Sequence, residues 1–187
     1  SRIRLKQLMD SIKLVFSSVY LKSARNYIES INYKLEEEKM AVILQEIVGE
    51  EFDNYYYPHI SGVAQSFNFY PTADLTNKDG IASIAFGLGK TVVEGGNHIR
   101  FSPNFPGKKL ISDQEILGNT QKDLYVLNLN DKDFRFSENY EGSILKIKLR
   151  DLKEHRSLSK VASTWDYQNN MLRDGINAKG PKIITFN

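Results

Sequence analysis

The sequence has no cysteine among its 187 residues, and it contains only one tryptophan, five prolines and three histidines. Without cysteine it can form no disulfide framework and no cysteine-based metal site. No apolar run reaches the roughly 18 residues that a membrane-spanning helix needs, and the charged, amphipathic start shows no signal-peptide pattern. We therefore expect no membrane partner and a cytoplasmic location.

Neither sign of charge dominates the chain. It has 25 Lys and Arg residues and 23 Asp and Glu residues, which gives a formal net charge of +2 at pH 7. The basic residues are scattered among acids, and the densest charged run is acidic, at residues 36–38. This balance argues against a nucleic-acid partner. The hydrophobic content of 41% and charged content of 26% are ordinary for a globular protein with a normal core.

The first part of the sequence predicts a helical arm, residues 1–37. Apolar residues in 2–20 recur at i, i+3, i+4 and i+7, which is the spacing of an amphipathic helix. A similar pattern continues through 21–37, and Ser17-Ser18 or Ser23 marks a break if there are two helices. An apolar stripe left partly exposed favours association with other chains, so we expect self-association through this arm.

The spacing of apolar residues changes in residues 38–187, and the new pattern predicts a strand-rich body. Residues 40–49 form a near-continuous apolar run of strand length. Further strands are expected in two short pieces within 55–70, and in 81–86, 98–101, 123–129, 144–149 and 182–186. Short helices are expected at 90–95 and 151–156 and within 103–121, a turn at 77–80, and a loop at 170–181. The fold class is therefore α+β: one domain over 1–187, with a helical arm and then a mainly antiparallel mixed sheet with short helices.

A glycine-rich stretch, IAFGLGKTVVEGG at residues 84–96, suggests a phosphate-binding loop. A P-loop would need glycine at position 84, which is Ile, and a dinucleotide fingerprint would need glycine at position 92, which is Val. Two interpretations remain. In the first, Gly87 and Gly89 form a strand-to-helix turn because both adopt special backbone angles. In the second, the N–H groups of the helix start bind an anion, and Lys90 strengthens that attraction.

The three histidines give no metal-binding pattern. His59 lies between Pro58 and Ile60 and is more readily explained as a hydrogen-bonded structural residue than as a catalytic one. His155 lies in a charged segment and is expected to be solvated. We expect no metal site and no catalytic residue in this chain.

Two further groups of residues admit a functional interpretation and a structural one. Asp131, Asp133 and Glu138 have the composition of a calcium loop but lack its spacing and its central glycine. Trp165 and Tyr167 could stack on a base, although packing in the core or at its edge is the simpler interpretation.

Four motifs together resemble a known family. They are EEEKMAVILQEIVG at 36–49, YPHISGVAQSFNFYP at 57–71, IAFGLGKTVVEGG at 84–96 and RFSP at 100–103. In this order they are similar to the central part of the PEP/pyruvate-binding, ATP-grasp-like domain of phosphoenolpyruvate synthases and pyruvate phosphate dikinases. The match is specific over about 36–103 and loose elsewhere.

The resemblance implies an ATP- and Mg²⁺-dependent phosphotransferase. In this family ATP phosphorylates a histidine on a separate swivelling domain, which carries the phosphoryl group to pyruvate. Most residues that contact ATP lie outside the matched region, and no Gln-x-Arg sequence occurs in this chain. We therefore expect a piece cut from a longer protein, with the remaining domains of that protein as partners. We expect ATP and Mg²⁺ to be bound by that parent protein and not to be retained by the piece, which should be inactive alone.

Some site residues are carried over by the resemblance. Gln45, Glu46 and Ile47 match the strand whose backbone meets adenine, and the Gly-Leu-Gly segment lies near the nucleotide cleft. Two departures are visible: Gln65-Ser66-Phe67-Asn68 replaces the usual continuation after Ser-Gly-Val-Ala, and Lys90 replaces an acidic residue. A non-catalytic module for nucleotide sensing or protein docking is therefore the alternative to an enzyme.

Overall fold

The computed structural model of the chain combines helices with antiparallel sheets, so the predicted α+β class is confirmed. It forms two compact units, residues 1–47 and 48–187, which we describe separately. The residues that the structure describes are 2–31, 34, 39–72, 74–130, 143–152 and 155–186, with only the backbone described at 155 and 156.

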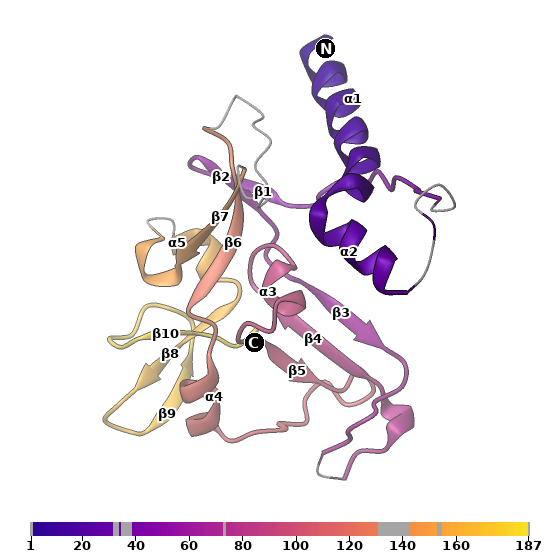
Figure 1. Cartoon of the computed structure of the whole chain (residues 1–187). Coiled ribbons are helices and arrows are strands. Elements are labelled where there is room, and N and C mark those ends of the chain that lie inside the picture. Colours follow the sequence, from indigo (N-terminus) through magenta and orange to yellow (C-terminus); the bar gives the residue numbers. More distant parts are fainter. Residues whose placement is uncertain are drawn as a thin grey trace. The chain divides into compact units, whose positions relative to one another are not determined.

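The first unit begins with two helices, α1 (Arg2–Ser17) and α2 (Lys22–Ser30), as Figure 1 shows. A 3₁₀ turn, Ser18–Tyr20, separates them, and Leu21 is extended with φ −62° and ψ 147°. The break therefore follows the Ser17-Ser18 position rather than Ser23. No residue of α1 is buried, whereas α2 buries Ile28.

The strand predicted for residues 40–49 is wrong. The structure gives residues 39–49 no regular secondary structure, and Ile43 and Val48 are 88% and 80% exposed. A strand requires a neighbour to satisfy its backbone N–H and C=O groups. Within the described residues, this segment pairs with no strand of the three sheets. The apolar run alone was therefore not enough to predict a strand.

Within its described residues, the second unit contains three antiparallel sheets. The first has the order β1-β2-β6-β7 and consists of Glu50–Phe52, Tyr55–Tyr57, Asp123–Asn128 and Ile144–Lys148 in chain order. The second has the order β3-β4-β5 and consists of Ser61–Gln65, Ile81–Ala85 and Ile99–Phe101. The third has the order β10-β8-β9, and in chain order its strands are Ala162–Asp166, Met171–Asp174 and Lys182–Ile184.

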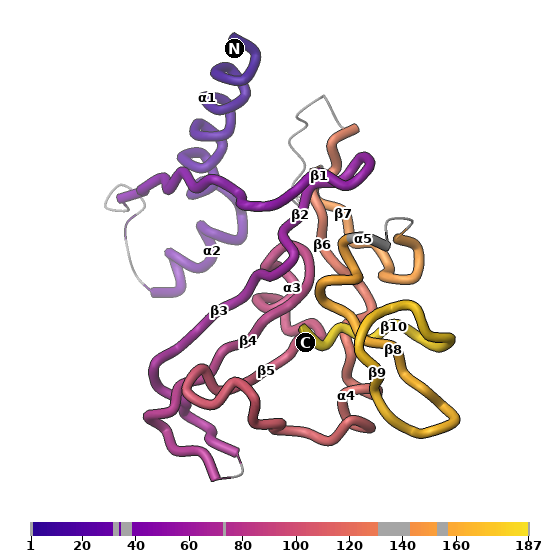
Figure 2. The backbone as a smooth tube through the Cα atoms, turned by 180° about the vertical axis from the view of Figure 1, so that it is seen from behind, coloured from indigo at the N-terminus to yellow at the C-terminus, as the bar shows by residue number. Residues whose placement is uncertain are grey.

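Short helices connect these strands: α3 (Lys90–Val93), α4 (Asp113–Asn119), α5 (His155–Leu158), and 3₁₀ turns at Asn77–Asp79 and Leu149–Asp151. The strands predicted near 81–86, 98–101, 123–129, 144–149 and 182–186 are confirmed, with ends shifted by one or two residues. The loop predicted over 170–181 is wrong at its start, because β9 pairs there with β8. Figure 2 shows the three strands of that last sheet together, viewed from behind.

Large buried side chains hold the second unit together. Tyr57 and Phe86 are fully buried and meet edge-to-face, with ring centroids 5.4 Å apart. The Tyr57 hydroxyl lies 3.1 Å from the Ser157 hydroxyl in this core. Trp165 is 1% exposed, which confirms its interpretation as a core residue, whereas Tyr167 is 71% exposed. Because Phe86 directly precedes the glycine-rich turn, this packing fixes where that turn starts.

Candidate functional site

The glycine-rich turn starts from a backbone that a buried amide side chain holds in place. Gln121 Oε1 accepts a hydrogen bond from the Phe86 N–H at 2.9 Å, and Gln121 Nε2 donates to the Phe86 carbonyl at 2.7 Å. The same Nε2 donates to the Asp123 carbonyl at 2.8 Å. Gln121 therefore connects the end of β4 to the start of β6.

Gly87 occupies a position that requires glycine. Its φ is +87°, and a Cβ atom there would lie 2.8 Å from the Tyr125 carbonyl oxygen. The Gly87 N–H donates to Pro58 O at 3.2 Å, and the Leu88 N–H donates to Tyr125 O at 2.8 Å. The Ser61 hydroxyl donates to the Gly87 carbonyl at 2.6 Å. The chain itself therefore uses the first two N–H groups of the turn.

Gly89 differs from Gly87, and the prediction of special backbone angles is wrong for it. It lies at φ −60° and ψ −9°, which any residue adopts. A Cβ atom there would approach only Ser61, at 3.8 Å. Gly89 is the residue that precedes α3, and a side chain there would make only an ordinary contact with Ser61.

The predicted short helix is confirmed as α3, and the Gly-Gly pair ends it as expected. Gly95 has φ +73°. The Gly96 N–H donates to Thr91 O at 2.9 Å, and the Gly95 N–H donates to Val92 O at 3.4 Å. This pair of bonds is the Schellman motif that terminates helices.

The Lys90 side chain is not solvated alone but belongs to a charged cluster. Its Nζ lies 3.3 Å from Glu94 Oε1 and 5.1 Å from the centre of the Tyr125 ring. Lys146 Nζ lies 5.7 Å from the same ring centre. The Tyr125 hydroxyl donates to Glu94 Oε2 at 2.7 Å. The Tyr125 ring thus contacts both ammonium groups. Its hydroxyl also donates to the Glu94 carboxylate, which pairs with Lys90.

These contacts stabilise the ionised form of Glu94. The hydrogen bond from Tyr125 is the main cause that lowers the pKa of Glu94 below its ordinary value. The Lys90 ammonium lowers that pKa further through a hydrogen bond and its charge, and Lys146 adds a smaller effect. Glu94 is therefore a carboxylate at neutral pH, and it pairs with the Lys90 ammonium group.

A cavity of about 300 Å³ adjoins this cluster. Its walls include Thr91, Glu94, Asp123, Tyr125 and Lys146, so both signs of charge line it. The Thr91 hydroxyl is buried and has no hydrogen-bond partner among the described residues. A polar recess of this size accommodates a small polar group such as a phosphate.

The two predicted groups of site residues lie in different units of the chain. Gln45, Glu46 and Ile47 are exposed and lie in the first unit. The phosphate-side residues, Gly87, Gly89 and Lys90, are brought together in the second unit. The strand that was to carry the first group is absent from the described structure, and its contact with adenine stays a prediction.

Of the histidines whose side chains are described, His59 and His98, neither shows a catalytic arrangement. His59 Nδ1 lies 4.0 Å from Glu50 Oε1, while its buried Nε2 has no hydrogen-bond partner in the described structure. Burial is the main cause that lowers the pKa of His59, the Lys160 charge lowers it further, and Glu50 opposes both. The expected full hydrogen bonding of His59 is therefore wrong for one nitrogen. The His155 side chain lies outside the described residues.

The described residues contain no group of three or more His, Asp or Glu side chains placed to hold a metal ion. The calcium-like residues Asp131, Asp133 and Glu138 lie outside the described part of the chain. No helix in that part is long and apolar enough to cross a membrane.

Sequence reasoning did not identify Tyr125, Lys146 and Gln121 as part of this site. Tyr125 had one available signal, because it lies in a strand whose alternation was recognised. Its position beside Lys90 depends on the hydrogen bond between Leu88 and Tyr125, and no local pattern shows such a bond.

Comparison with known proteins identified one family. The family model described as pyruvate phosphate dikinase, AMP/ATP-binding domain, matches residues 3–161. No curated protein and no solved structure matched the chain. The helices followed by antiparallel sheets with short helices are consistent with an ATP-grasp-like domain.

Proposed function

The chain belongs to the family of pyruvate phosphate dikinase AMP/ATP-binding domains, and on that premise we propose that it is the nucleotide-binding part of an ATP-dependent phosphotransferase of the phosphoenolpyruvate synthase type. The observation that carries the proposal is the family match, which spans residues 3–161 of 187. The parent enzyme would transfer phosphate from ATP to a histidine on a swivelling domain, and then to pyruvate or a similar acceptor. Such enzymes act mainly by positioning phosphates and neutralising their charge.

Within the second unit, we assign the phosphate side of the nucleotide to the turn at Gly87, Gly89 and Lys90. The side chain of Lys90 is only 25% exposed, and Glu94 holds it at 3.3 Å. An incoming phosphate would compete with Glu94 for the ammonium group. Gly89 has no side chain to shield its backbone, and the Ser61 side chain lies 3.8 Å from where its Cβ atom would be, which supports the approach of a small ligand there.

On the family resemblance alone, we propose a role in adenine binding for Gln45, Glu46 and Ile47 of the first unit. In this role their backbone groups would hydrogen-bond the edge of the base. Their exposure is compatible with such contacts.

The residues at the turn do not fit a Mg²⁺ site. Glu94 and Asp123 are the carboxylates of the adjoining cavity. Glu94 is paired with Lys90 at 3.3 Å and Asp123 with Lys146 at 3.7 Å. Mg²⁺ prefers oxygen ligands without competing cations. We therefore assign Mg²⁺ to the parent protein and derive no step from it here.

Beyond the expectation from the sequence that ATP is not retained, we propose that the chain alone binds a nucleotide at the Lys90 turn. It should not turn the nucleotide over, since it contains no Gln-x-Arg sequence. The test measures ATP binding by calorimetry, and phosphoryl exchange between ATP and pyruvate in parallel. Binding without exchange supports the proposal. Exchange above background that a Lys90→Ala substitution abolishes would contradict the expected inactivity.

A non-catalytic nucleotide sensor or docking module is the second candidate. The observation that favours it is the engagement of Lys90 by Glu94 and Tyr125, which leaves this cation less available for chemistry. Supplying the purified swivelling domain of a family enzyme distinguishes the two functions. If the chain belongs to an enzyme, the histidine of the swivelling domain should become phosphorylated. If the chain is a sensor, it should bind ATP and leave that histidine unmodified.

A further inference from the structure

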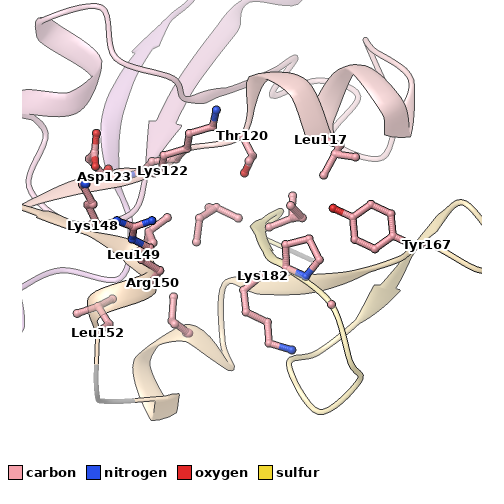
Figure 3. Close-up of a pocket in the computed structure, with 16 residues that line it drawn as sticks. Leu117, Thr120, Lys122, Asp123, Lys148, Leu149, Arg150, Leu152, Tyr167 and Lys182 are labelled. Carbon is pink, nitrogen blue, oxygen red and sulfur yellow. Dashed lines mark hydrogen bonds between the residues drawn. The ribbon is translucent and has the colours of Figure 1, made fainter.

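A cavity of about 740 Å³ in the 48–187 unit (Figure 3) belongs with the site already described. It shares Gln121, Lys122 and Asp123 with the recess beside the Lys90 turn, so it extends that recess. A separate feature of the same unit is the free edge of the strand β3, Ser61–Gln65.

β3 is an edge strand whose outer side has no neighbouring strand among the described residues. β4 lies beside β3, and β5 lies beyond β4 (Figure 1). The register is continuous from Ser61 opposite Ala85 to Gln65 opposite Ile81. In an antiparallel pair, alternate residues direct their N–H and C=O groups away from the partner strand. The outer side of β3 therefore presents backbone groups that can pair with a further strand.

β3 lacks the charges that protect the other sheet edges. Each of the other edge strands in the described sheets carries at least one charged side chain: Glu50 and Glu51 in β1, Lys146 and Lys148 in β7, Arg100 in β5, Arg173 and Asp174 in β9, and Lys182 in β10. Charges and prolines on an edge strand discourage pairing with another chain. The β3 sequence, Ser-Gly-Val-Ala-Gln, has neither. Among the described edges, β3 is therefore the one open to such pairing.

The uncharged character extends well beyond β3. Residues 54–73 contain no Asp, Glu, Lys or Arg, although these residue types make up 26% of the chain, and no other such run is half as long. Burial does not explain this composition at β3, because four of its five residues are exposed and Val63 is 48% exposed. Depletion of charge on an exposed surface is typical of the centre of a protein–protein interface.

Aromatic side chains extend this surface just after β3. Phe67 and Phe69 are 46% and 68% exposed, and their rings meet edge-to-face with centroids 5.0 Å apart. The buried Asn68 between them fixes their loop, because its N–H donates to Asn77 O at 2.7 Å and its carbonyl accepts from Asn77 Nδ2 at 2.8 Å. Aromatic residues on a fixed loop lose little conformational freedom when a partner covers them.

The occupant that fits this edge is the same strand of a second copy. β3 lies in the middle of the run 54–73, with seven residues of the run before it and eight after it. If two copies of β3 pair antiparallel about a two-fold axis at Val63, Gly62 lies opposite Ala64 of the other copy. No charge then opposes a like charge along either strand. The two β-branched Val63 side chains lie opposite each other, which is a favourable cross-strand pair.

We propose that the chain forms a symmetric dimer by antiparallel pairing of β3 with β3 of a second copy. The two three-stranded sheets then become one sheet of six strands, which is an ordinary size for a sheet. The interface uses no residue of α1 and none of the phosphate-site residues Gly87, Gly89 and Lys90. It goes beyond the proposed function and stands even if the turn binds no nucleotide.

The test uses the full chain with Leu5→Glu and Phe16→Glu, which removes association through α1, and measures its mass by light scattering. We expect the mass of two chains. Adding Val63→Lys should weaken the dimer about tenfold or more, because two ammonium groups then meet at the two-fold axis. Adding Val63→Glu should weaken it for the same reason. An equal mixture of the Lys and Glu variants should restore the dimer, because opposite charges then meet, and this recovery shows that both variants fold.

Cross-linking tests the register of the pair. The chain has no cysteine, so one substitution introduces a unique thiol. Directly opposed residues in an antiparallel pair have Cβ atoms about 4.5–5.5 Å apart, so Val63→Cys chains should join through a short bis-maleimide. Val93→Cys is the matched control, because Val93 lies on α3 and is more exposed, at 79%. It should not cross-link above background.

Each outcome decides the proposal. A dimer that Val63→Lys weakens, that the mixture restores and that cross-links through Val63→Cys supports it. A Leu5→Glu, Phe16→Glu chain that is monomeric at every concentration overturns it. Slow hydrogen exchange of the β3 amides in that monomer would mean that one chain covers its own edge, and fast exchange would mean that the edge serves a different protein. A dimer unaffected by Val63→Lys, no recovery in the mixture, or equal cross-linking at Val63 and Val93 also overturns it.

Discussion

The backbone of Gly87 lies so close to that of Tyr125 that a Cβ atom at Gly87 would be 2.8 Å from the Tyr125 carbonyl oxygen. The same oxygen accepts the hydrogen bond of the Leu88 N–H. This contact joins the glycine-rich turn to β6, the strand that carries the aromatic ring beside Lys90. The position of Lys90 therefore depends on Gly87, although Gly87 itself contacts no charged group.

Gly87→Ala should destabilise the chain by about 1–3 kcal/mol, because alanine is strained at φ +87° and its methyl group meets the Tyr125 carbonyl. Gly89→Ala is the matched control, since Gly89 has a helical backbone and an added methyl group would make only an ordinary 3.8 Å contact with Ser61. Denaturant unfolding of both variants measures the difference. Equal stability of the two variants would show that the turn does not need this backbone conformation.

Tyr125→Phe should raise the pKa of Glu94 toward its ordinary value, because the hydroxyl donates the bond that lowers it most. A carboxylate with a lowered folded-state pKa stabilises the protein above its unfolded-state pKa, and this stabilisation is lost as the pH falls through the folded-state value. As the pH falls, Tyr125→Phe should therefore lose this stabilisation at a higher pH than the wild type does. A ¹³C-detected titration of Glu94 checks this, with Tyr70→Phe at an exposed ring as the control. An unchanged Glu94 pKa would contradict the assigned hydrogen bond.

Protonation of His59 should destabilise the fold in mild acid. Its pKa lies below the ordinary 6.5 because of burial first and the Lys160 charge second, with Glu50 opposing them. A lowered histidine pKa means that the unfolded chain takes up the proton more readily, so stability falls as the pH drops through 6.5 toward the folded-state pKa. His59→Gln should flatten this part of the curve of unfolding free energy against pH, and His98→Gln should not. A curve of unchanged slope in His59→Gln would exclude His59 as the cause.

The first helix should promote self-association. No residue of α1 is buried, and Leu5 and Phe16, on one face, are 60% and 49% exposed. Light scattering at rising concentration should show an increasing mass for the wild type. Leu5→Glu with Phe16→Glu should abolish the increase, while Lys6→Glu, which changes the charge by the same amount, should not. A wild type that stays monomeric at all concentrations would contradict this expectation.

The sequence predicted the strand–turn–helix at 81–95 because each part depends on local signals. An apolar strand, a glycine before the helix and a Gly-Gly pair after it act within a few residues of one another. The sequence failed at 40–49, because whether an apolar run forms a strand depends on a partner elsewhere in the chain. It also failed at β9, where the turn that pairs β8 with β9 contains no glycine and instead places Asn170 at φ 53°.

The site was predictable only in part for the same reason. Gly87 and Lys90 lie in one motif, so their proximity follows from the sequence. The contacts of Lys90 and Lys146 with the Tyr125 ring bring together residues from three separate elements. That arrangement arises from sheet register and from the Leu88–Tyr125 hydrogen bond, which composition and spacing do not reveal.

Titration of the chain with ATP, followed at the Gly87 and Gly89 amides, tests the central claim of a nucleotide-binding domain most directly. The account predicts saturable shifts at both glycines. It also predicts about a tenfold loss of affinity, or roughly 1.4 kcal/mol, in Lys90→Ala, and no loss in the control Lys78→Ala. Saturable binding at these glycines that Lys90→Ala leaves unchanged would remove the lysine from the phosphate site. The absence of any saturable ATP binding would contradict the proposed function itself.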